Sequence, residues 1–349
     1  MEKGEFMRSN LKVMTEKVSI SVEEGMGAKK PTTNSNLKYA SLAILVLQNA
    51  GLILTIRYSR TLTGDMYISS TAVVFAELFK LVACLFLTFL EIKDVPSWFR
   101  YLHQNIFADP MATIKVAVPS FIYVIQNNLQ FVAISNLDAA TFQVTYQLKV
   151  LTTAIFSVFM LNKTLSKMQW FSLFLLFSGI ALVQLQPSQL KAKNPDDTQN
   201  PMIGFLAVLV SSVCSGFAGV YFEKILKGTG SGQGVSIWLR NIQLGMFGTL
   251  LGIIGMMFND GAKIREKGVL YGYSNLVWFV IFMQAFGGLL VAVVVKYADN
   301  ILKGFATSIA IIVSCIVSIY VFNFVLSLQF CLGTLLVMTA IFFYGRPQK

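Results

Sequence analysis

Ten long apolar runs follow one another along this 349-residue chain, and they constrain its fold more than any other feature. Each is about 18 to 24 residues long, enough for a helix to cross roughly 30 Å of hydrocarbon. We place the runs near 38–58, 70–92, 112–134, 138–161, 168–186, 202–224, 236–257, 275–296, 300–322 and 325–344. The sequence therefore predicts an all-α membrane protein with ten transmembrane helices.

Composition supports the same class. Hydrophobic residues make up 55% of the chain and charged residues only 13%, whereas a soluble protein usually carries about twice that share of charge. A soluble fold of this size could not bury so much apolar surface, so lipid has to cover the rest. The net charge of +11 is spread over a tail and short loops, which indicates membrane topology and argues against nucleic-acid binding.

Polar segments divide the chain into parts. Residues 1–36 are polar and mixed in charge, which predicts a disordered cytosolic tail without a secretory signal. Residues 187–201 form the longest internal polar break and separate a first half, 37–186, from a second half, 202–345, with five predicted spans each. A short end, 346–349, follows.

Lysine and arginine indicate the orientation. They are more frequent in the amino-terminal tail, the even-numbered loops and the carboxyl end than in the odd-numbered loops. Because cytosolic loops carry an excess of these residues, both termini are predicted to lie in the cytosol.

An internal repeat supports the division into halves. A shift of 161 residues aligns Asp138 with Asp299 and Ser157 with Ser318. Since five helices per half is an odd number, the second half would enter the membrane upside down. Two inverted five-helix repeats would place a substrate site between them near the midplane and permit alternating access. This favours a carrier over a channel or an enzyme.

An ionisable residue inside a predicted span is costly and therefore a functional candidate, and Glu77, Lys80 and Lys149 are such residues. Glu77 and Lys80 are three residues apart on one helix face, so they form either a structural ion pair or a substrate contact. Lys149 lies in the middle of 138–161, and a cation at that depth predicts a contact with an anionic substrate.

Polar side chains also follow a helical stripe in 112–134. Tyr123, Asn127 and Gln130 recur at helical spacing, with Gln126 beside them, and Tyr146 continues the pattern in the next run. Hydrogen bonds between helices could account for some of these residues. Tyr123, Asn127 and Tyr146 remain candidates for contact with a substrate.

Lys303 follows a predicted helix start. Asp299 or Asn300 is a plausible N-cap, which would put Lys303 in the first turn or so. A helix N-terminus with a lysine suits phosphate, although a lysine that extends to the membrane interface is the alternative. Lys149 and Lys303, one from each half, would together suit a diphosphate.

Catalytic motifs are missing from the sequence. It contains no P-loop, GxSxG or HExxH motif, and His103 is its single histidine. The cysteines lie in apolar runs without CxxC spacing and are expected to be packing residues: Cys84, Cys214, Cys315 and Cys331. We expect no catalytic residue, metal site or cofactor.

Four stretches carry a family resemblance: LDAATFQVTYQLKVLTTAIFSV, SGFAGVYFEKILK, WLRNIQ and VVVKYADNILKGFATS. They resemble the Golgi nucleotide-sugar transporters of the drug/metabolite transporter superfamily, and the likeness extends from Leu37 to Gly345. Within that family QNAGLILTIRYSRT and QNNLQFVAISNL are most similar to the UDP-galactose branch.

The resemblance implies an antiporter in the Golgi membrane. It would carry UDP-galactose, with UDP-N-acetylgalactosamine as a further candidate, into the lumen in exchange for UMP. By the same resemblance Lys149 and Lys303 would engage phosphate, Tyr123 and Asn127 would line the nucleotide pocket with Gly216 and Asn241 nearby, and Glu77 and Lys80 would lie at the sugar end. Besides UDP-sugar, UMP and membrane lipid, a homo-oligomer and Golgi glycosyltransferases are candidate partners.

Three positions depart from the CMP-sialic acid branch. Phe142, Gly245 and Val291 stand where that branch has two tyrosines and a threonine, which disfavours CMP-sialic acid as the substrate. UDP-N-acetylglucosamine or CMP-sialic acid transport by the same fold and a scaffold for glycosyltransferases remain alternatives. An exporter of cationic compounds is a further one, but it should present a carboxylate without nearby lysines.

Overall fold

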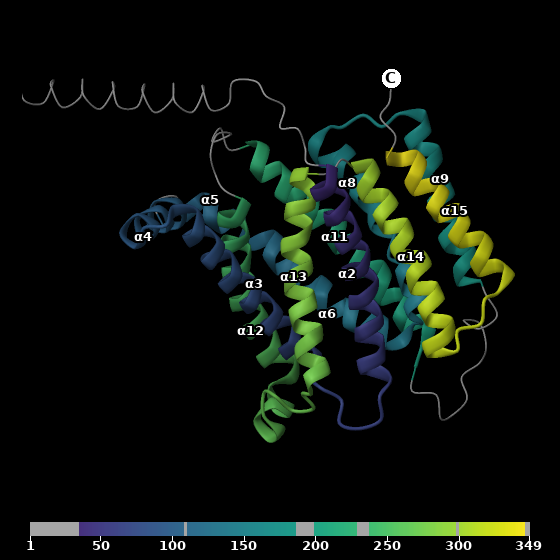
Figure 1. The fold of residues 1–349 in the computed structure, drawn as a ribbon, viewed down its shortest axis with the longest axis horizontal. Coiled ribbons are helices and arrows are strands. Elements are labelled where there is room, and N and C mark those ends of the chain that lie inside the picture. Colours follow the sequence, from purple (N-terminus) through teal and green to yellow (C-terminus); the bar gives the residue numbers. More distant parts are fainter. Residues whose placement is uncertain (1–34, 108–109, 186–198, 229–236, 298–299, 346–349) are drawn as a thin grey trace, which may run out of the picture. The chain divides into compact units, whose positions relative to one another are not determined.

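The computed structural model describes residues 35–107, 110–185, 199–228, 237–297 and 300–345. The chain divides into two compact units, Met1–Ala40 and Ser41–Lys349, and apart from the start of the first described helix all the described residues belong to the second. Within the described residues all regular structure is helical and no strand occurs. The helices are α2 (Ser35–Thr61), α3 (Ser69–Ile92), α4 (Val95–Leu102), a π-helix η1 (His103–Phe107), α5 (Pro110–Lys115), α6 (Ala117–Asn136), α7 (Ala139–Thr145), α8 (Leu148–Leu161), α9 (Lys167–Gln184), α11 (Pro201–Gly228), α12 (Ile237–Lys267), α13 (Asn275–Tyr297), α14 (Asn300–Phe322) and α15 (Leu328–Gly345), as Figure 1 shows.

Seven helical segments in this part of the chain are long and apolar enough to cross a membrane. They are Ala40–Thr61, Ser69–Ile92, Ala139–Leu161, Lys167–Gln184, Pro201–Ile225, Trp238–Lys267 and Leu328–Gly345. Two shorter apolar segments, Asn275–Leu290 and Ala306–Phe322, belong to α13 and α14. The prediction of a multi-pass, all-helical membrane protein is confirmed, while ten spans and an inverted repeat stay predictions.

The predicted span 112–134 is not among those seven. The structure divides it into α5 and α6, with Val116 between them. The stripe of amide side chains on α6, which includes Gln126, Asn127 and Gln130, lowers the mean hydropathy of this helix. The polar residues that made α6 a candidate for function therefore also explain why it is not among the seven long apolar segments.

The predicted span 138–161 is interrupted near its middle. Helix α7 ends at Thr145, α8 begins at Leu148, and the N–H groups of Gln147, Lys149 and Val150 each donate to the carbonyl three residues before. The side-chain amide of Gln147 donates to the carbonyl oxygen of Gln143 at 3.0 Å, which is the acceptor that its own backbone N–H would have used in an α-helix. Lys149 consequently lies in the first turn of α8.

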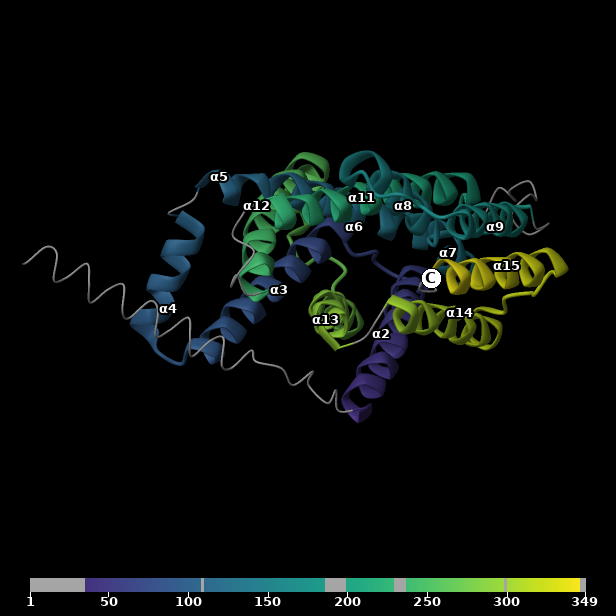
Figure 2. The same ribbon diagram turned by 90° about the horizontal axis from the view of Figure 1, so that it is seen from above.

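Helices from different parts of the sequence pack against one another. Helix α6 packs on α11, α3 on α12, and α9 on α15, which run side by side in both views (Figures 1 and 2). The α9–α15 contact is close because Gly179 faces Gly333, and a Cβ added at Gly179 would lie 2.7 Å from the Gly333 carbonyl oxygen.

The bundle has two distinguishable ends. We call the end that holds the connections 62–68 and 268–274 the odd-loop end, and the end that holds α4 and η1 the even-loop end (Figure 1). The charge pattern predicts that the even-loop end is cytosolic.

Candidate functional site

Glu77 and Lys80 form an ion pair on α3. The Lys80 Nζ atom lies 2.6 Å from Glu77 Oε2, and the Glu77 side chain is buried. Asn127 of α6 donates from Nδ2 to Glu77 Oε1 at 3.4 Å. Helix α12 covers the pair at Gly248, where an added Cβ would lie 2.8 Å from Glu77 Oε2. The two charges are in contact, as their spacing predicted, and the pair joins α3 to α6 and to a helix of the second half. A contact of either residue with substrate stays a prediction.

Tyr146 is the centre of a second polar cluster. Gln126 and Gln130 of α6 each donate from Nε2 to the Tyr146 hydroxyl oxygen at 2.9 Å. These two bonds occupy the acceptor positions of the hydroxyl, so its proton points elsewhere, and Ser211 and Ser215 of α11 lie beside it. The interpretation of the α6 amides as groups that bind neighbouring helices is confirmed for these two glutamines.

The ring of Tyr146 holds Lys149. The Lys149 Nζ atom lies 4.5 Å from the ring centroid, which is a cation–π contact. The Phe142 ring also stacks on the Tyr146 ring, with centroids 5.4 Å apart. A cation is therefore held at a defined place in the first turn of α8.

Helix α6 connects the two clusters. Its consecutive residues Gln126 and Asn127 contact Tyr146 and Glu77, respectively. The structure thus brings five of the predicted site residues into two adjoining groups through one polar helix: Glu77, Lys80, Asn127, Tyr146 and Lys149.

Two further predicted residues lie on or beside α11. An added Cβ at Gly216 would lie 2.5 Å from Thr152 Oγ1, so this glycine lets α11 approach α8 one turn after Lys149. An added Cβ at Gly219 would lie 3.9 Å from the Tyr123 hydroxyl oxygen. The structure gives Gly216 a packing role, and its contact with substrate stays a prediction.

The remaining predicted residues lie in the second half. Asn241 is half-buried on α12. Lys303 lies in the first turn of α14, which begins at Asn300 as predicted, and its side chain is outside the described residues, as is Asp299. The pairing of Lys149 with Lys303 around a diphosphate therefore stays a prediction.

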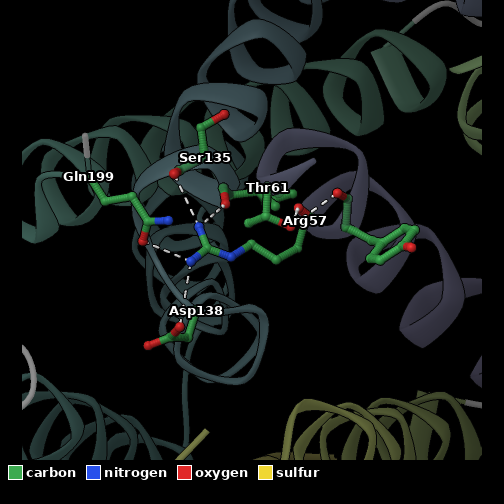
Figure 3. Close-up of polar contacts among 7 residues, drawn as sticks. Arg57, Thr61, Ser135, Asp138 and Gln199 are labelled. Carbon is green, nitrogen blue, oxygen red and sulfur yellow. Dashed lines mark hydrogen bonds and ion pairs between the residues drawn. The ribbon is translucent and has the colours of Figure 1, made fainter. Parts of the chain in front are cut away.

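A polar cluster at the odd-loop end was not predicted (Figure 3). Arg57 is buried and donates from Nη1 to the carbonyl oxygens of Ile134 and Ser135, both at 3.0 Å, and from Nη2 to Gln199 Oε1 at 2.8 Å. Asp138 Oδ1 lies 3.5 Å from Nη2. Partial burial raises the pKa of the Asp138 carboxyl above its usual range, and the Arg57 charge offsets part of that rise.

Arg60 extends this cluster. Its Nε atom donates to Ser135 Oγ at 2.8 Å, and its guanidinium lies 5.0 Å from the centroid of the Tyr67 ring. In the charge pattern both arginines indicated only topology, whereas the structure places them in the last two turns of α2. Their spacing of three residues puts them on one helix face, and this was the available signal.

The odd-loop end also joins the two halves. The Tyr271 hydroxyl donates to Asp65 Oδ1 at 2.6 Å, and Thr71 and Tyr273 share a hydrogen bond of 2.7 Å. These contacts link the connection 62–68 and the start of α3 to the connection 268–274. The first and second halves are therefore tied together at this end.

The family model and the curated relatives agree with each other. The family model for nucleotide-sugar transporters matches residues 33–345. The UDP-galactose translocators of Bos taurus and Homo sapiens are each 54% identical to this chain over 327 residues, covering 92% of it and 82% and 81% of their own lengths. The UDP-N-acetylglucosamine transporter of Rattus norvegicus is 52% identical over 322 residues, covering 90% of this chain and 97% of its own length. One solved crystal structure aligns over 88% of this chain and 96% of its own with 12% identity and a TM-score of 0.48, which is too distant a likeness to bear on the site.

Proposed function

The chain belongs to the nucleotide-sugar transporter family, and we propose that it carries UDP-galactose from the cytosol into the Golgi lumen in exchange for UMP. The observation that carries the proposal is the 54% identity to UDP-galactose translocators over most of both chains. Ten spans in two inverted halves, 37–186 and 202–345, with both termini in the cytosol, complete the proposed architecture.

Lys149 supports an anionic substrate. A lysine inside a membrane-spanning segment is costly, and the cation–π contact with Tyr146 attracts the ammonium group without neutralising its charge. A phosphate oxygen can accept hydrogen bonds from an ammonium group and also neutralises its charge. We assign Lys149, together with Lys303, to the diphosphate of the substrate.

The Glu77–Lys80–Asn127 cluster supports a sugar as the neighbouring group. A carboxylate, an ammonium and an amide side by side supply both acceptors and donors for hydroxyl groups. We assign this cluster to the sugar end of the substrate, and Tyr123, Asn241 and Gly216 to the nucleotide end.

Exchange follows from the same charges. UMP retains a phosphate and the uridine, so it can engage the cations that bind UDP-sugar. A carrier that reorients while empty would leave those cations in a low-dielectric site without their anion, which is unfavourable. Reorientation of the loaded carrier is therefore favoured in both directions, and this favours strict exchange of UDP-sugar for UMP.

A second substrate is favoured by one specific observation. The identity to UDP-N-acetylglucosamine transporters is 52%, only slightly lower than that to UDP-galactose translocators. UDP-N-acetylglucosamine is therefore the second candidate, with the same mechanism.

The test is uptake into proteoliposomes preloaded with UMP. Radiolabelled UDP-galactose, UDP-N-acetylgalactosamine, UDP-N-acetylglucosamine and CMP-sialic acid are offered in parallel, with empty proteoliposomes as the control for exchange. We expect UDP-galactose uptake that depends on internal UMP. Uptake of another sugar nucleotide alone would overturn the substrate, and equal uptake without internal nucleotide would overturn the exchange mechanism.

A further inference from the structure

Helix α4 leaves the end of α3 through a sharp turn. Lys93 adopts a left-handed conformation with φ 60°, and its N–H donates to the Phe89 carbonyl oxygen at 2.7 Å, which closes α3. Asp94 then caps α4, because its carboxylate accepts from the Ser97 N–H at 2.9 Å. As a result α4 lies across the direction of α3 at the even-loop end (Figure 1) and leads from the end of α3 to α5 (Figure 2).

One face of this segment packs on the protein. Trp98 lies edge-on to Phe89 of α3 with ring centroids 6.0 Å apart. Leu102 and Ile106 follow at helical spacing and pack in the cluster that contains Leu239 of α12. These contacts fix how α4 and η1 are rotated about their own axes.

A second face is largely apolar and exposed. Val95, Phe99 and Phe107 are 50%, 61% and 63% exposed and recur at multiples of four residues. Exposed His103 lies on the same face, with its ring centroid 5.9 Å from that of Phe107. Between this face and the packed face lies a polar strip that includes Arg100 and Gln104, both exposed. A helix with separate protein-facing, apolar and polar faces is typical of an element that lies in a membrane surface.

The exposed apolar face continues along the neighbouring helices. Val82, Phe86 and Leu90 form an exposed stripe on α3, which is one of the candidate spans. On the other side Met111 and Ile114 of α5 are exposed. Since the stripe on a spanning helix faces hydrocarbon, the face of α4 that continues it meets the lipid at the boundary of the same leaflet.

We propose that α4 and η1 form an interfacial element whose partner is the phospholipid leaflet at the even-loop end. Val95, Phe99 and Phe107 lie in the outer acyl layer, and Arg100 lies at the level of the lipid phosphates. The contact holds the end of α3, the helix that carries Glu77 and Lys80, at a fixed depth in the membrane.

Spin labels on the full-length protein test the proposal. Each variant carries a single label, at Phe99→Cys, at Phe107→Cys or at Gln104→Cys. In all of them Cys214, Cys315 and Cys331 are replaced by alanine, and buried Cys84 is kept. A label at Phe86→Cys serves as the hydrocarbon reference. Power saturation in phospholipid nanodiscs then compares access of oxygen, which partitions into lipid, with access of a water-soluble nickel chelate. UMP-dependent uptake shows that each variant is folded.

We expect labels at residues 99 and 107 to favour oxygen, as the label at residue 86 does, and the label at residue 104 to favour the nickel chelate. The two apolar positions should lie about 5–10 Å below the phosphates. Access of nickel at residues 99 and 107 equal to that at residue 104 would place the face in water and overturn the proposal. Protection from both reagents would show that protein, such as a second copy of this chain, covers the face, which would equally overturn it.

Discussion

The Nζ atom of Lys149 lies 4.5 Å from the centroid of the Tyr146 ring, so the position of one cation is set by one aromatic side chain. The ring is in turn held through its hydroxyl, which accepts hydrogen bonds from Gln126 and Gln130. A polar stripe on α6 therefore helps to position a charge on α8 through the Tyr146 ring. Substitutions of Tyr146 can therefore separate the contribution of the hydroxyl, which binds α6, from that of the ring, which contacts Lys149.

Tyr146→Phe and Tyr146→Leu should impair transport to different degrees. Phenylalanine keeps the cation–π contact and leaves the amides of buried Gln126 and half-buried Gln130 without this acceptor, so we expect a loss of stability of about 1–3 kcal/mol and a modest rise in KM. Leucine also removes the contact with Lys149, and about 1–2 kcal/mol of cation–π attraction corresponds to a further rise in KM of roughly 5- to 30-fold. Exchange kinetics and thermal unfolding of both variants measure these effects, and equal KM values for the two would contradict the role of the ring.

Lys149→Ala should lower kcat/KM for the nucleotide sugar by about 10- to 160-fold, because a hydrogen bond to a charged group is worth roughly 1.5–3 kcal/mol. The matched control is Lys163→Ala, since Lys163 pairs with Glu223 at 2.8 Å on an exposed surface and such pairs contribute about 0–1 kcal/mol. The measurement is UMP-dependent uptake by purified, folded protein. Normal exchange by Lys149→Ala would rule out its assignment to phosphate.

The Glu77–Lys80 pair can be separated into its structural and substrate-binding roles. Glu77→Gln leaves Lys80 without its buried partner, so we expect destabilisation of about 3–5 kcal/mol. The double variant Glu77→Gln/Lys80→Met removes both charges and should recover most of that stability while uptake stays impaired. Thermal unfolding and uptake are measured on the same preparations. Recovery of uptake together with stability would show that the pair is purely structural.

The ends of most helices followed from the sequence because apolar runs and their polar flanks are local properties. Helix α13 begins at Asn275 and α14 begins at Asn300, as the runs indicated. Helix α12, by contrast, continues to Lys267, ten residues past the predicted end, since a helix can extend beyond the hydrocarbon into water.

The interruption between α7 and α8 could not be read from hydropathy. No proline or glycine marks it, and it depends on the Gln147 side chain replacing its own backbone N–H at the Gln143 carbonyl oxygen. The Arg57 cluster was missed for a different reason, because its acceptors are mostly backbone carbonyls on another helix. Backbone acceptors leave no trace in a sequence, whereas the Glu77–Lys80 pair was predictable from spacing alone.

Gly179→Ala should loosen the contact between α9 and α15. The added Cβ would lie 2.7 Å from the Gly333 carbonyl oxygen, and backbone cannot move aside as a flexible side chain can, so we expect a loss of about 1–3 kcal/mol. Gly255→Ala on α12 is the matched control because nothing lies within 4 Å of its added Cβ. There we expect no loss, or a gain of up to about 1 kcal/mol from helix propensity. Equal melting temperatures for the two variants in nanodiscs would contradict the close approach.

Arg57→Lys should fail to replace arginine at the odd-loop end, although it keeps the charge. The guanidinium donates to the carbonyl oxygens of Ile134 and Ser135 and to Gln199 at once, and an ammonium on a differently shaped side chain cannot reproduce that fork. Because a buried carbonyl without a donor costs about 1–3 kcal/mol, we expect Arg57→Lys to destabilise the protein by that amount or more. Arg57→Ala should cost more, since it also leaves partly buried Asp138 without its cation. Thermal unfolding in nanodiscs measures both variants, with Lys163→Ala as the control for loss of a surface charge. A melting temperature for Arg57→Lys equal to that of the unmodified protein would show that charge alone, and not the three directed hydrogen bonds, holds α2 to the turn between α6 and α7.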